Sequence, residues 1–183
     1  MFRFGAVGLV VSLAFAPGFA GQGRAGLVED LHEDPGFRTY QPSGALEAPG
    51  MVYAVHMDGL AYRPVECVKP INVFDQGKLK IEVDPGRTSS CASDARAHVN
   101  ERFYLTGIEV KENALVFSLL TVDAHTILMG KKMVEESYSM DVRVALPKHL
   151  VDTMTVADVH RLADPIFSSA KRVVVPENVA PPN

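Results

Sequence analysis

The sequence has few cysteines, no tryptophan and no concentrated stretch of basic residues. Each of these shortages narrows what the chain can do. Of its 183 residues, 2 are cysteine and none is tryptophan. The 18 lysines and arginines are outnumbered by 22 acids, and they form no cluster: Lys131-Lys132, for example, is an isolated pair. Binding to nucleic acid needs a cluster of basic side chains, so we expect no nucleic-acid partner.

Sequence motifs of several enzyme classes are also missing. No Gly-x-Gly-x-x-Gly or Gly-x-x-x-x-Gly-Lys loop follows a predicted strand, which leaves nucleotide binding without support. His-Glu-x-x-His, Gly-x-Ser-x-Gly and Cys-x-x-Cys are absent as well, and with them the common zinc-protease, serine-hydrolase and dithiol-redox signatures. We therefore expect no cofactor, and we favour a role without catalysis over an enzymatic one.

The longest apolar run is short and lies at the N-terminus. Residues 5–16 carry no charged side chain and follow a start with one positive charge at Arg3. About a dozen apolar residues suit a signal peptide, whereas a membrane-spanning helix needs about 20. Gly18 and Ala20 are small residues at the two positions that a signal peptidase reads, so residues 1–20 are predicted to be a signal peptide. A cut after Ala16, a retained anchor and an ordinary buried helix are the alternatives.

Export would place the working chain outside the cytoplasm, in the periplasm or secreted. Removal of 20 of the 183 residues leaves 163, enough for one domain with its own core. Arg3 leaves with the signal, so the net charge of −4 becomes −5. Without a basic patch, an anionic membrane surface is not expected as a partner, and no stable membrane span is expected after cleavage.

Cys67 and Cys91 both lie in the predicted mature part. An even number of cysteines in an exported chain favours a disulfide. Counted inclusively from 67 to 91, the closed loop would hold 25 residues, for which the chain-entropy model gives roughly 3.5 kcal/mol of stabilisation. Two free thiols or a metal pair are the alternatives, but the spacing lacks the close pairing of a zinc knuckle.

The chain divides into an arm, a domain and a tail. Residues 21–50 are rich in glycine, proline and charge, which predicts a linker or loosely ordered arm with at most one helical turn at 27–31. A single β-rich domain with a C-terminal helix is predicted over 51–175, and a flexible tail over 176–183.

Alternating and apolar runs predict short strands. Asp58-Gly59 predicts a tight hairpin turn between the first two of them. The predicted strands cover residues 51–57, 60–68, 71–74, 78–83, 103–110, 114–121, 126–129, 133–146 and, at an edge, 173–175. The pair 103–110 and 114–121 is apolar on both faces and is expected at the centre of the sheet. Residues 87–100 are predicted to be a loop, or a short helix over 93–99.

One helix is predicted after Thr155, which can cap it together with Asp158 in a variant of the capping box. Its apolar stripe consists of Val156, Val159, Leu162, Ala163, Ile166 and Phe167. Pro165 should kink this helix or start it anew. The expected fold class is α+β: antiparallel β-hairpins form a curved sheet or partly open barrel, with the C-terminal helix packed on one face.

Three pairs place histidine and aspartate two residues apart. They are His56/Asp58, Asp123/His125 and Asp158/His160. Residues two apart on a strand share a face, and imidazole with carboxylate suits zinc or manganese. The turn at Asp58-Gly59 explains that aspartate without a metal, however, and chance spacing among 6 histidines explains the pattern.

Other side chains could carry chemistry, each with a simpler alternative. Ser168 and Lys171 form a Ser-x-x-Lys, in which the lysine tunes the serine of some acyltransferases, or they end a helix. Methionines 129, 133 and 140 could bind copper or fill gaps in the core. The carboxylates available for glycoside cleavage are Glu101, Glu109, Glu135 and Glu136, although no tryptophan is present to stack on a sugar.

Residues 104–117, Tyr-Leu-Thr-Gly-Ile-Glu-Val-Lys-Glu-Asn-Ala-Leu-Val-Phe, resemble a hairpin of uncharacterised exported bacterial proteins. In those proteins a later strand leads into a Pro-Lys-hydrophobic segment and a helix with an acidic start. Residues 142–150 and 155–167 would correspond here. The resemblance implies a β-rich module with a helix and carries no activity.

These observations favour an exported, non-catalytic module that binds a partner protein or a component of the cell envelope. The edges of its sheet would suit strand addition. One alternative is an extracytoplasmic hydrolase with a dispersed active site, which predicts a pocket where two titratable groups converge. The other is a carrier of metal or a small ligand that uses the His/Asp pairs. The oligomeric state is left open.

Overall fold

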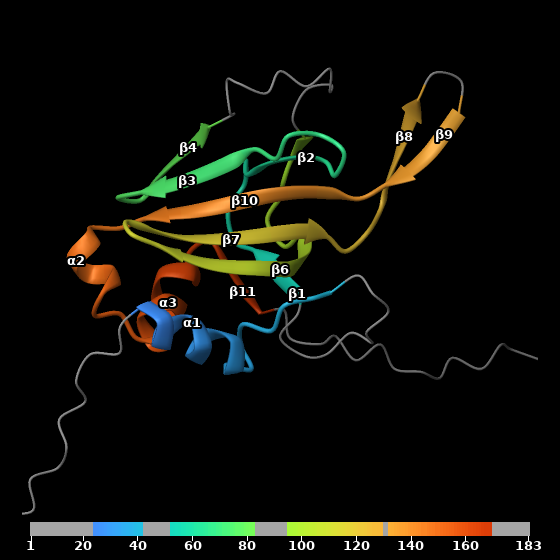
Figure 1. The fold of residues 1–183 in the computed structure, drawn as a ribbon. Helices are drawn as coiled ribbons and strands as arrows, with labels where there is room; N and C mark the ends of the chain where they lie inside the picture. The colour runs from blue at the N-terminus through green and yellow to red at the C-terminus, as the bar shows by residue number, and fades with distance from the viewer. Residues whose placement is uncertain (1–23, 42–51, 83–94, 130–131, 170–183) are drawn as a thin grey trace, which may run out of the picture.

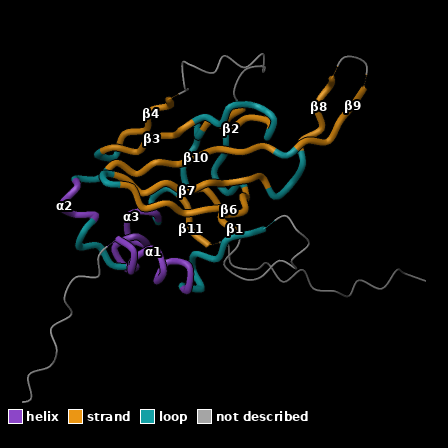
Figure 2. Tube along the Cα trace, in the orientation of Figure 1, coloured by secondary structure: helices purple, strands orange, loops and turns teal. Residues whose placement is uncertain are grey.

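A curled sheet shaped like half a barrel forms the body of the protein in the computed structural model (Figure 1). The structure describes residues 24–41, 52–82, 95–129 and 132–169. A few short helices accompany the strands (Figure 2). The predicted β-rich fold with a curved sheet is confirmed.

Most of the strands are short. In chain order the elements are α1 (Arg24–Glu33), β1 (Val52–Val55), β2 (Ala61–Pro64), β3 (Ile71–Asp75), β4 (Lys78–Glu82), β5 (Ala95–Arg96), β6 (Arg102–Lys111), β7 (Ala114–Thr121), β8 (His125–Met129), β9 (Lys132–Glu136), β10 (Tyr138–Ala145), α2 (Lys148–Val151), α3 (Val156–Ala163) and β11 (Phe167–Ser169). The main sheet follows the order β11-β1-β6-β7-β10-β2-β5, with β3 also paired to β10 and β4 paired to β3.

The hairpin β6–β7 forms the centre of the sheet, as predicted. Lys111 pairs with Ala114 across its two-residue loop. Leu115, Val116 and Phe117 follow one another in β7 and are all buried. Consecutive side chains of a strand point to opposite faces, so both faces of β7 are covered.

The strand β3 runs parallel to β10, which the expectation of antiparallel hairpins alone did not include. One side of β10 pairs with β7 along its whole length. The other side pairs first with β2 and then with β3, so that two strands share one edge. The predicted hairpin of β3 with β4 is present, and Gln76 and Gly77 in its turn have φ values of 48° and 79°. Two positive φ angles at the centre of a two-residue loop are typical of a type I′ hairpin.

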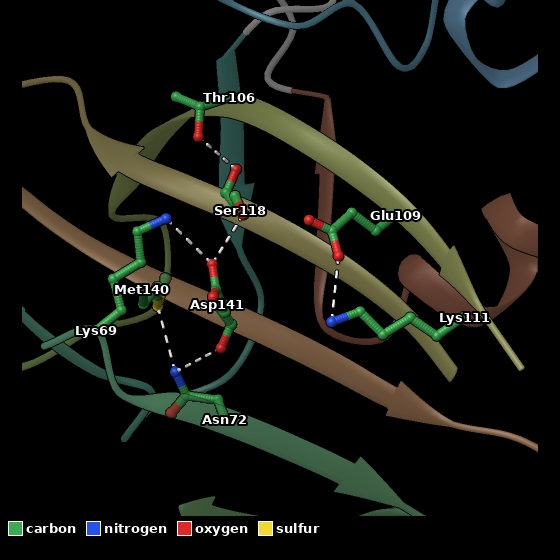
Figure 3. Close-up of polar contacts among 8 residues, drawn as sticks. All are labelled: Lys69, Asn72, Thr106, Glu109, Lys111, Ser118, Met140 and Asp141. Atoms are coloured by element: carbon green, nitrogen blue, oxygen red, sulfur yellow. Dashed lines mark hydrogen bonds and ion pairs between the residues drawn. The ribbon is translucent and has the colours of Figure 1, made fainter. Parts of the chain in front are cut away.

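Asn72 on β3 lies where the pairing partner of β10 changes from β2 to β3. Its side chain is fully buried, and its amide imitates a peptide group. Oδ1 accepts the N–H of Ala61 at 2.7 Å, and Nδ2 donates to the carbonyl of Ala61 at 2.9 Å. Nδ2 also lies 3.3 Å from the carbonyl of Asp141 and 3.6 Å from the sulfur of Met140 (Figure 3). One side chain therefore satisfies the backbone groups that a continuous strand would have paired.

The carboxylate of Asp141 joins neighbouring parts of the sheet on one face. Its Oδ1 accepts a hydrogen bond of 2.8 Å from the hydroxyl of Ser118 on β7, and it lies 3.4 Å from Nζ of Lys69 (Figure 3). Thr106 on β6 donates in turn to the backbone carbonyl of Ser118 at 3.0 Å. These contacts link β6, β7 and β10 beyond their backbone ladder.

The prediction that Asp58-Gly59 closes a hairpin is wrong. The strand before it, β1, pairs with β6 and β11, whereas the strand after it, β2, pairs with β10 and β5. The turn itself is real, because Gly59 has a φ of 90°. It is held by the loop after β5: Gly59 N–H donates to the carbonyl of Ala97, and Asp58 Oδ1 accepts the N–H of Val99. These tertiary hydrogen bonds fix the turn in a position from which β2 pairs with β10 and β5 and not with β1.

Residues 95–99 are likewise not helical, contrary to one of the two predictions for residues 87–100. Ala95 and Arg96 form β5 and pair with β2. Ser93 and Asp94, where that helix would begin, lie outside the described residues. Ala97 is fully buried, so this segment is fixed by burial and sheet pairing rather than by helix propensity.

The predicted long strand 133–146 divides at Ser137. Its first part, β9, pairs only with β8 in a separate two-stranded sheet, and its second part, β10, enters the main sheet. Two hydrogen bonds mark the division: the carbonyl of Ser137 accepts the N–H of Val65, and Thr121 Oγ1 accepts the N–H of Tyr138. The hairpin β8–β9 projects from one end of the sheet (Figure 1).

The interpretation of residues 21–50 as a linker or loose arm is wrong for residues 24–41. The ten-residue helix α1 buries Leu27 and Leu31, and Phe37 after it is 1% exposed. All three belong to the same core cluster as the central strands. The hydroxyl of Tyr53 donates to the carbonyl of Gly36 and fastens the segment to β1. These three apolar side chains suffice to fix the segment because each of them is buried.

The helix α3 begins at the predicted capping box. The side chain of Thr155 accepts the N–H of Asp158, and Asp158 accepts the N–H of Thr155. The predicted continuation through Phe167 is wrong, because α3 ends at Ala163 and Phe167 lies in β11. Pro165 has no N–H to donate to the preceding turn, which favours an end there. The edge strand predicted at 173–175 lies outside the described residues.

Acid should weaken this cap. The hydroxyl and the backbone N–H of Thr155 donate to the carboxylate of Asp158, and with nearby Arg161 they lower its pKa below the ordinary value of 3.8. A depressed pKa in the folded state adds stability above the unfolded pKa, and this stability is lost as the pH falls through the folded one. Urea titrations should therefore show that Asp158→Asn costs stability at pH 7 and that the difference from wild type shrinks below about pH 4.

Asp123→Asn is the control, since that carboxylate is 82% exposed and its ion-pair distance is 3.5 Å. A difference for Asp158→Asn that stays constant with pH would contradict this account.

Candidate functional site

The structure places the predicted His/Asp pairs in different surroundings. Asp58 holds the loop at Val99 and lies 3.8 Å from Nδ1 of His98. Asp123 lies 3.5 Å from Arg102, and His125 lies 3.9 Å from Glu101. Each of these aspartates has a structural partner that is not its sequence neighbour.

The third pair is divided in the same way. Asp158 caps α3 and also pairs with Arg161 at 2.9 Å. His160 points elsewhere: its Nε2 lies 3.2 Å from Asp34, and its ring stacks on Phe37 at a centroid distance of 4.3 Å. Among the described residues, no three side chains of His, Cys, Asp or Glu are grouped to hold a metal ion.

The other candidates are also dispersed. Glu109 pairs with Lys111 at 3.1 Å, and Glu135 and Glu136 belong to the projecting strand β9. Met133 is 65% exposed while Met140 is fully buried, so these two do not share a soft-ligand site. Cys91 and Lys171 lie outside the described residues, which leaves the disulfide with Cys67 and the Ser-x-x-Lys pairing as predictions.

One constellation does bring predicted residues together: Ser168 and His56. The hydroxyl of Ser168 lies 3.0 Å from Nε2 of His56, although the two are 112 positions apart. The antiparallel pairing of β1 with β11 sets Ser168 opposite Ala54, and His56 follows two residues after Ala54 on the same face. The small side chain of Ala54 leaves the imidazole free to lie diagonally toward the serine.

A backbone carbonyl orients the imidazole. Nδ1 of His56 lies 2.7 Å from the carbonyl oxygen of Asp164, which can only accept a hydrogen bond. The proton of the neutral ring is therefore on Nδ1, and Nε2 has its lone pair toward Ser168. Asp164 is the C-cap of α3, so the histidine also satisfies one of the carbonyls that a helix end leaves unpaired. The contact is on the exposed side of the sheet.

A second cluster lies at the root of the hairpin β8–β9. The rings of Tyr62, His125 and Tyr138 are within 4.8 to 5.6 Å of one another. Burial raises the pKa of Tyr62 far above its usual value, and the neighbouring charge of Glu101 and a hydrogen bond to it add to the rise. Glu101 Oε2 also accepts the N–H of His98 at 3.0 Å. This packing joins β2, β8 and β10 and fixes the base of the hairpin.

Beyond this root, strand β9 is exposed. All four residues of β9 from Lys132 to Glu135 are exposed, among them Met133 at 65% and Val134 at 37%. Adjacent residues of a strand point to opposite faces, so both faces of the hairpin present apolar surface. Neither outer edge of β8–β9 is paired with another strand in the described part of the chain.

Two adjoining cavities lie at the opposite end of the sheet, near α2 and α3. Their volumes are about 270 and 470 Å³, and they share Leu146 and Leu162. Small-molecule sites usually occupy about 300–1,000 Å³. Two of the polar side chains that line the first cavity, Asp158 and Arg161, pair with each other at 2.9 Å.

Comparison with protein-family models, curated proteins and solved structures gives no match for this chain. No helix among the described residues is long and apolar enough to cross a membrane. The exposed hairpin β8–β9 and the Ser168–His56 contact are the features of the described structure that bear on function.

Sequence reasoning named both His56 and Ser168 but did not bring them together. The apolar stripe predicts a helix through Phe167, and Ser168 would then belong to the turn that ends it. The sequence signal for β11 is weak, because this strand has only three residues, Phe167, Ser168 and Ser169, two of which are serines. Only the pairing of β11 with β1 reveals the contact.

Proposed function

We propose that this protein is an exported binding module, periplasmic or secreted, that binds an extended segment of a partner protein along the hairpin β8–β9. One observation carries this proposal: the hairpin forms its own two-stranded sheet, with both outer edges unpaired among the described residues. Strand addition would give the partner a backbone ladder together with side-chain contacts on alternate positions. This binding requires no catalytic group.

Physical reasons favour a third strand at this place. An isolated two-stranded hairpin is marginally stable in water, and stability usually needs three or more strands or a packing partner. Met133 and Val134 would become buried on such an addition, which supplies a hydrophobic contribution.

The charges on β9 indicate the chemistry of the partner. Glu135 is exposed and Glu136 is partly exposed, both near the root of the hairpin, whereas Lys132 is near its tip. Opposite charges directly across a strand pair stabilise it. We therefore propose an extended segment with apolar residues and a basic side chain that meets Glu135 or Glu136.

The root of the hairpin supports this role. The aromatic contacts of Tyr62 and Tyr138 with His125 hold the first residue of β8 against the main sheet. A fixed root lowers the entropy that is lost on binding. The same proposal includes the signal peptide over residues 1–20, a disulfide between Cys67 and Cys91, and a C-terminal helix packed on one face of the sheet.

Photocrosslinking from the hairpin tests the proposal. With a photoreactive amino acid at Met133, the exported protein should form a discrete adduct with a partner protein in its native compartment. The same amino acid at Val65, which is 52% exposed on the body of the protein, is the matched control and should give no such adduct. Val134→Thr keeps strand propensity but removes apolar surface, and in the Met133 crosslinking background it should reduce the yield several-fold.

Circular dichroism should show the Val134→Thr protein folded as the wild type is, because the side chain lies outside the core. Equal crosslinking from positions 133 and 65, or an adduct yield that Val134→Thr leaves unchanged, would argue against the hairpin as the binding site. An adduct that contains only a second copy of this chain would replace the proposed partner by self-association.

A further inference from the structure

The contact between Ser168 and His56 has the geometry of a nucleophile and its base, and we propose that Ser168 accepts an acyl group from oxygen esters. A nucleophilic serine needs a base within hydrogen-bonding distance and a third group that orients the base. The distance from Ser168 Oγ to His56 Nε2 is 3.0 Å, and that from His56 Nδ1 to the carbonyl of Asp164 is 2.7 Å. This site is separate from the hairpin β8–β9 and does not depend on its function.

The reaction balances with an ester and water as the only reactants. Ser168 Oγ attacks the ester carbonyl while its proton passes to Nε2 of His56, and a tetrahedral intermediate forms. The bond from the carbonyl carbon to the alkoxy group then breaks, and the proton on Nε2 goes to the departing alkoxide, which leaves as an alcohol. Water then attacks the carbonyl of the acyl-serine while its proton passes to Nε2 of His56. The bond from the carbonyl carbon to Ser168 Oγ breaks and the proton returns to Oγ, which gives a carboxylic acid and free Ser168.

The end of α3 assists the histidine. His56 becomes positively charged when it takes the serine proton, and Nδ1–H then points at the carbonyl of the C-cap Asp164. The C-terminus of a helix carries partial negative charge, which stabilises a nearby cation. The carbonyl fixes the ring as the carboxylate of a serine-protease triad does, but with a partial charge in place of a full one.

A backbone donor lies next to the serine. His56 N–H bonds to the carbonyl of Ile166, while Val55 bonds to residues 100 and 101 on the other side of β1. In an antiparallel pair, successive residues of a strand direct their backbone N–H and C=O groups alternately to one side and to the other. The backbone groups of Ser168 therefore point toward β1, and the N–H of Ser169 points toward the opposite edge of β11. No strand of the described chain pairs with that edge. The N–H after a nucleophile is a suitable donor to a developing oxyanion.

These features define the class of substrate. A single backbone donor stabilises an oxyanion less than two do, and removal of one donor typically costs about 100- to 1,000-fold in rate. The exposed position of the contact also gives little exclusion of water. Esters, whose alkoxide leaving groups depart more readily than amines, therefore fit this site, and amides do not. Access from solvent suits a small acyl group carried on a larger molecule.

The contact could instead be structural, since His56 caps α3 whatever Ser168 does. His56→Asn separates the two roles. An asparagine side chain can still donate an N–H to the carbonyl of Asp164, but it cannot accept the serine proton. A structural role predicts that this variant affects stability alone, whereas the proposed role predicts loss of reactivity in a folded protein.

The test uses p-nitrophenyl acetate with the full exported chain, and peptide mapping by mass spectrometry locates the acetyl group. Ser168 in the wild type should be acetylated at least about 100-fold faster than in His56→Asn, the size of a typical general-base contribution. Ser168→Ala should lose the acetyl group at this position and the associated burst of nitrophenol. Ser118→Ala is the matched control, because that hydroxyl donates to Asp141 rather than to an imidazole.

The dependence on pH provides a second readout that does not require a variant to fold. Acetylation of Ser168 should rise with pH and then reach a plateau, because a general base accepts the serine proton only in its neutral form. Acetylation of Ser168 no faster than that of Ser118, or a rate that rises with hydroxide without a plateau, overturns the proposal. So does a folded His56→Asn protein that reacts as fast as the wild type.

Discussion

Replacement of Phe37 by alanine should lower the free energy of unfolding by about 4 kcal/mol, the usual cost of deleting a buried phenylalanine ring. The ring is 1% exposed and lies at the centre of an aromatic group. It stacks on His160 at 4.3 Å and lies 6.1 Å from Phe117 and 6.5 Å from Tyr53, measured between ring centroids. Alanine would leave a cavity among these rings, which they cannot fill without moving.

Urea denaturation monitored by circular dichroism measures this effect. Phe37→Leu should lose clearly less stability, because leucine retains most of the buried volume. Val65→Ala is the control, since that side chain is 52% exposed and should change stability by less than about 0.5 kcal/mol. A loss below 1 kcal/mol for Phe37→Ala would mean that residues 24–41 are not part of the cooperative fold.

Replacement of Asn72 by leucine should cost about 3 kcal/mol. The leucine is apolar and of similar size, but it leaves both the N–H and the carbonyl of Ala61 without their side-chain partner. Each buried polar group left unpaired costs about 1–3 kcal/mol. The mutation also removes the donor to the carbonyl of Asp141. The effect should be larger than the loss of one hydrogen bond, because water cannot reach a site that is fully buried.

Ser139→Ala is a sharp control for Asn72→Leu. Ser139 is 3% exposed, and its hydroxyl has no hydrogen-bond partner among the described residues. Removal of an unsatisfied buried hydroxyl should leave stability unchanged or raise it slightly. The two residues lie at the same junction of β2, β3 and β10, so a general intolerance of change there predicts similar losses. Equal losses for Ser139→Ala and Asn72→Leu would contradict the role assigned to the Asn72 amide.

Much of the local structure could be predicted from the sequence. The alternation over residues 78–83 and the turn before it gave the hairpin β3–β4, and the two apolar runs around residues 111–113 gave β6–β7. Thr155 and Asp158 gave the start of α3. In each case the partners lie within a few residues, so propensity and hydrogen bonding act between groups that the chain itself keeps close.

Prediction from the sequence fails where groups distant in the chain decide the structure of a segment. Asp58-Gly59 has the chemistry of a hairpin turn, but the loop after β5 supplies the hydrogen bonds that fix it. Residues 24–41 have too few apolar side chains to predict a packed helix. Leu31 and Phe37 are nevertheless buried because the sheet leaves room for them. Burial depends on the surface that a segment meets, which composition alone does not specify.

The sequence by itself determined a β-rich chain with its central hairpin and the capped helix near its end, and it predicts an export signal. Only the tertiary structure decided that His56 meets Ser168, that Asn72 completes the ladder at Ala61, and that β8–β9 stands apart from the main sheet. The physical reason is the length of chain between the partners. His56 and Ser168 share no local pattern across 112 positions. They meet because β11 pairs with one edge of β1, and this pairing places Ser168 beside His56.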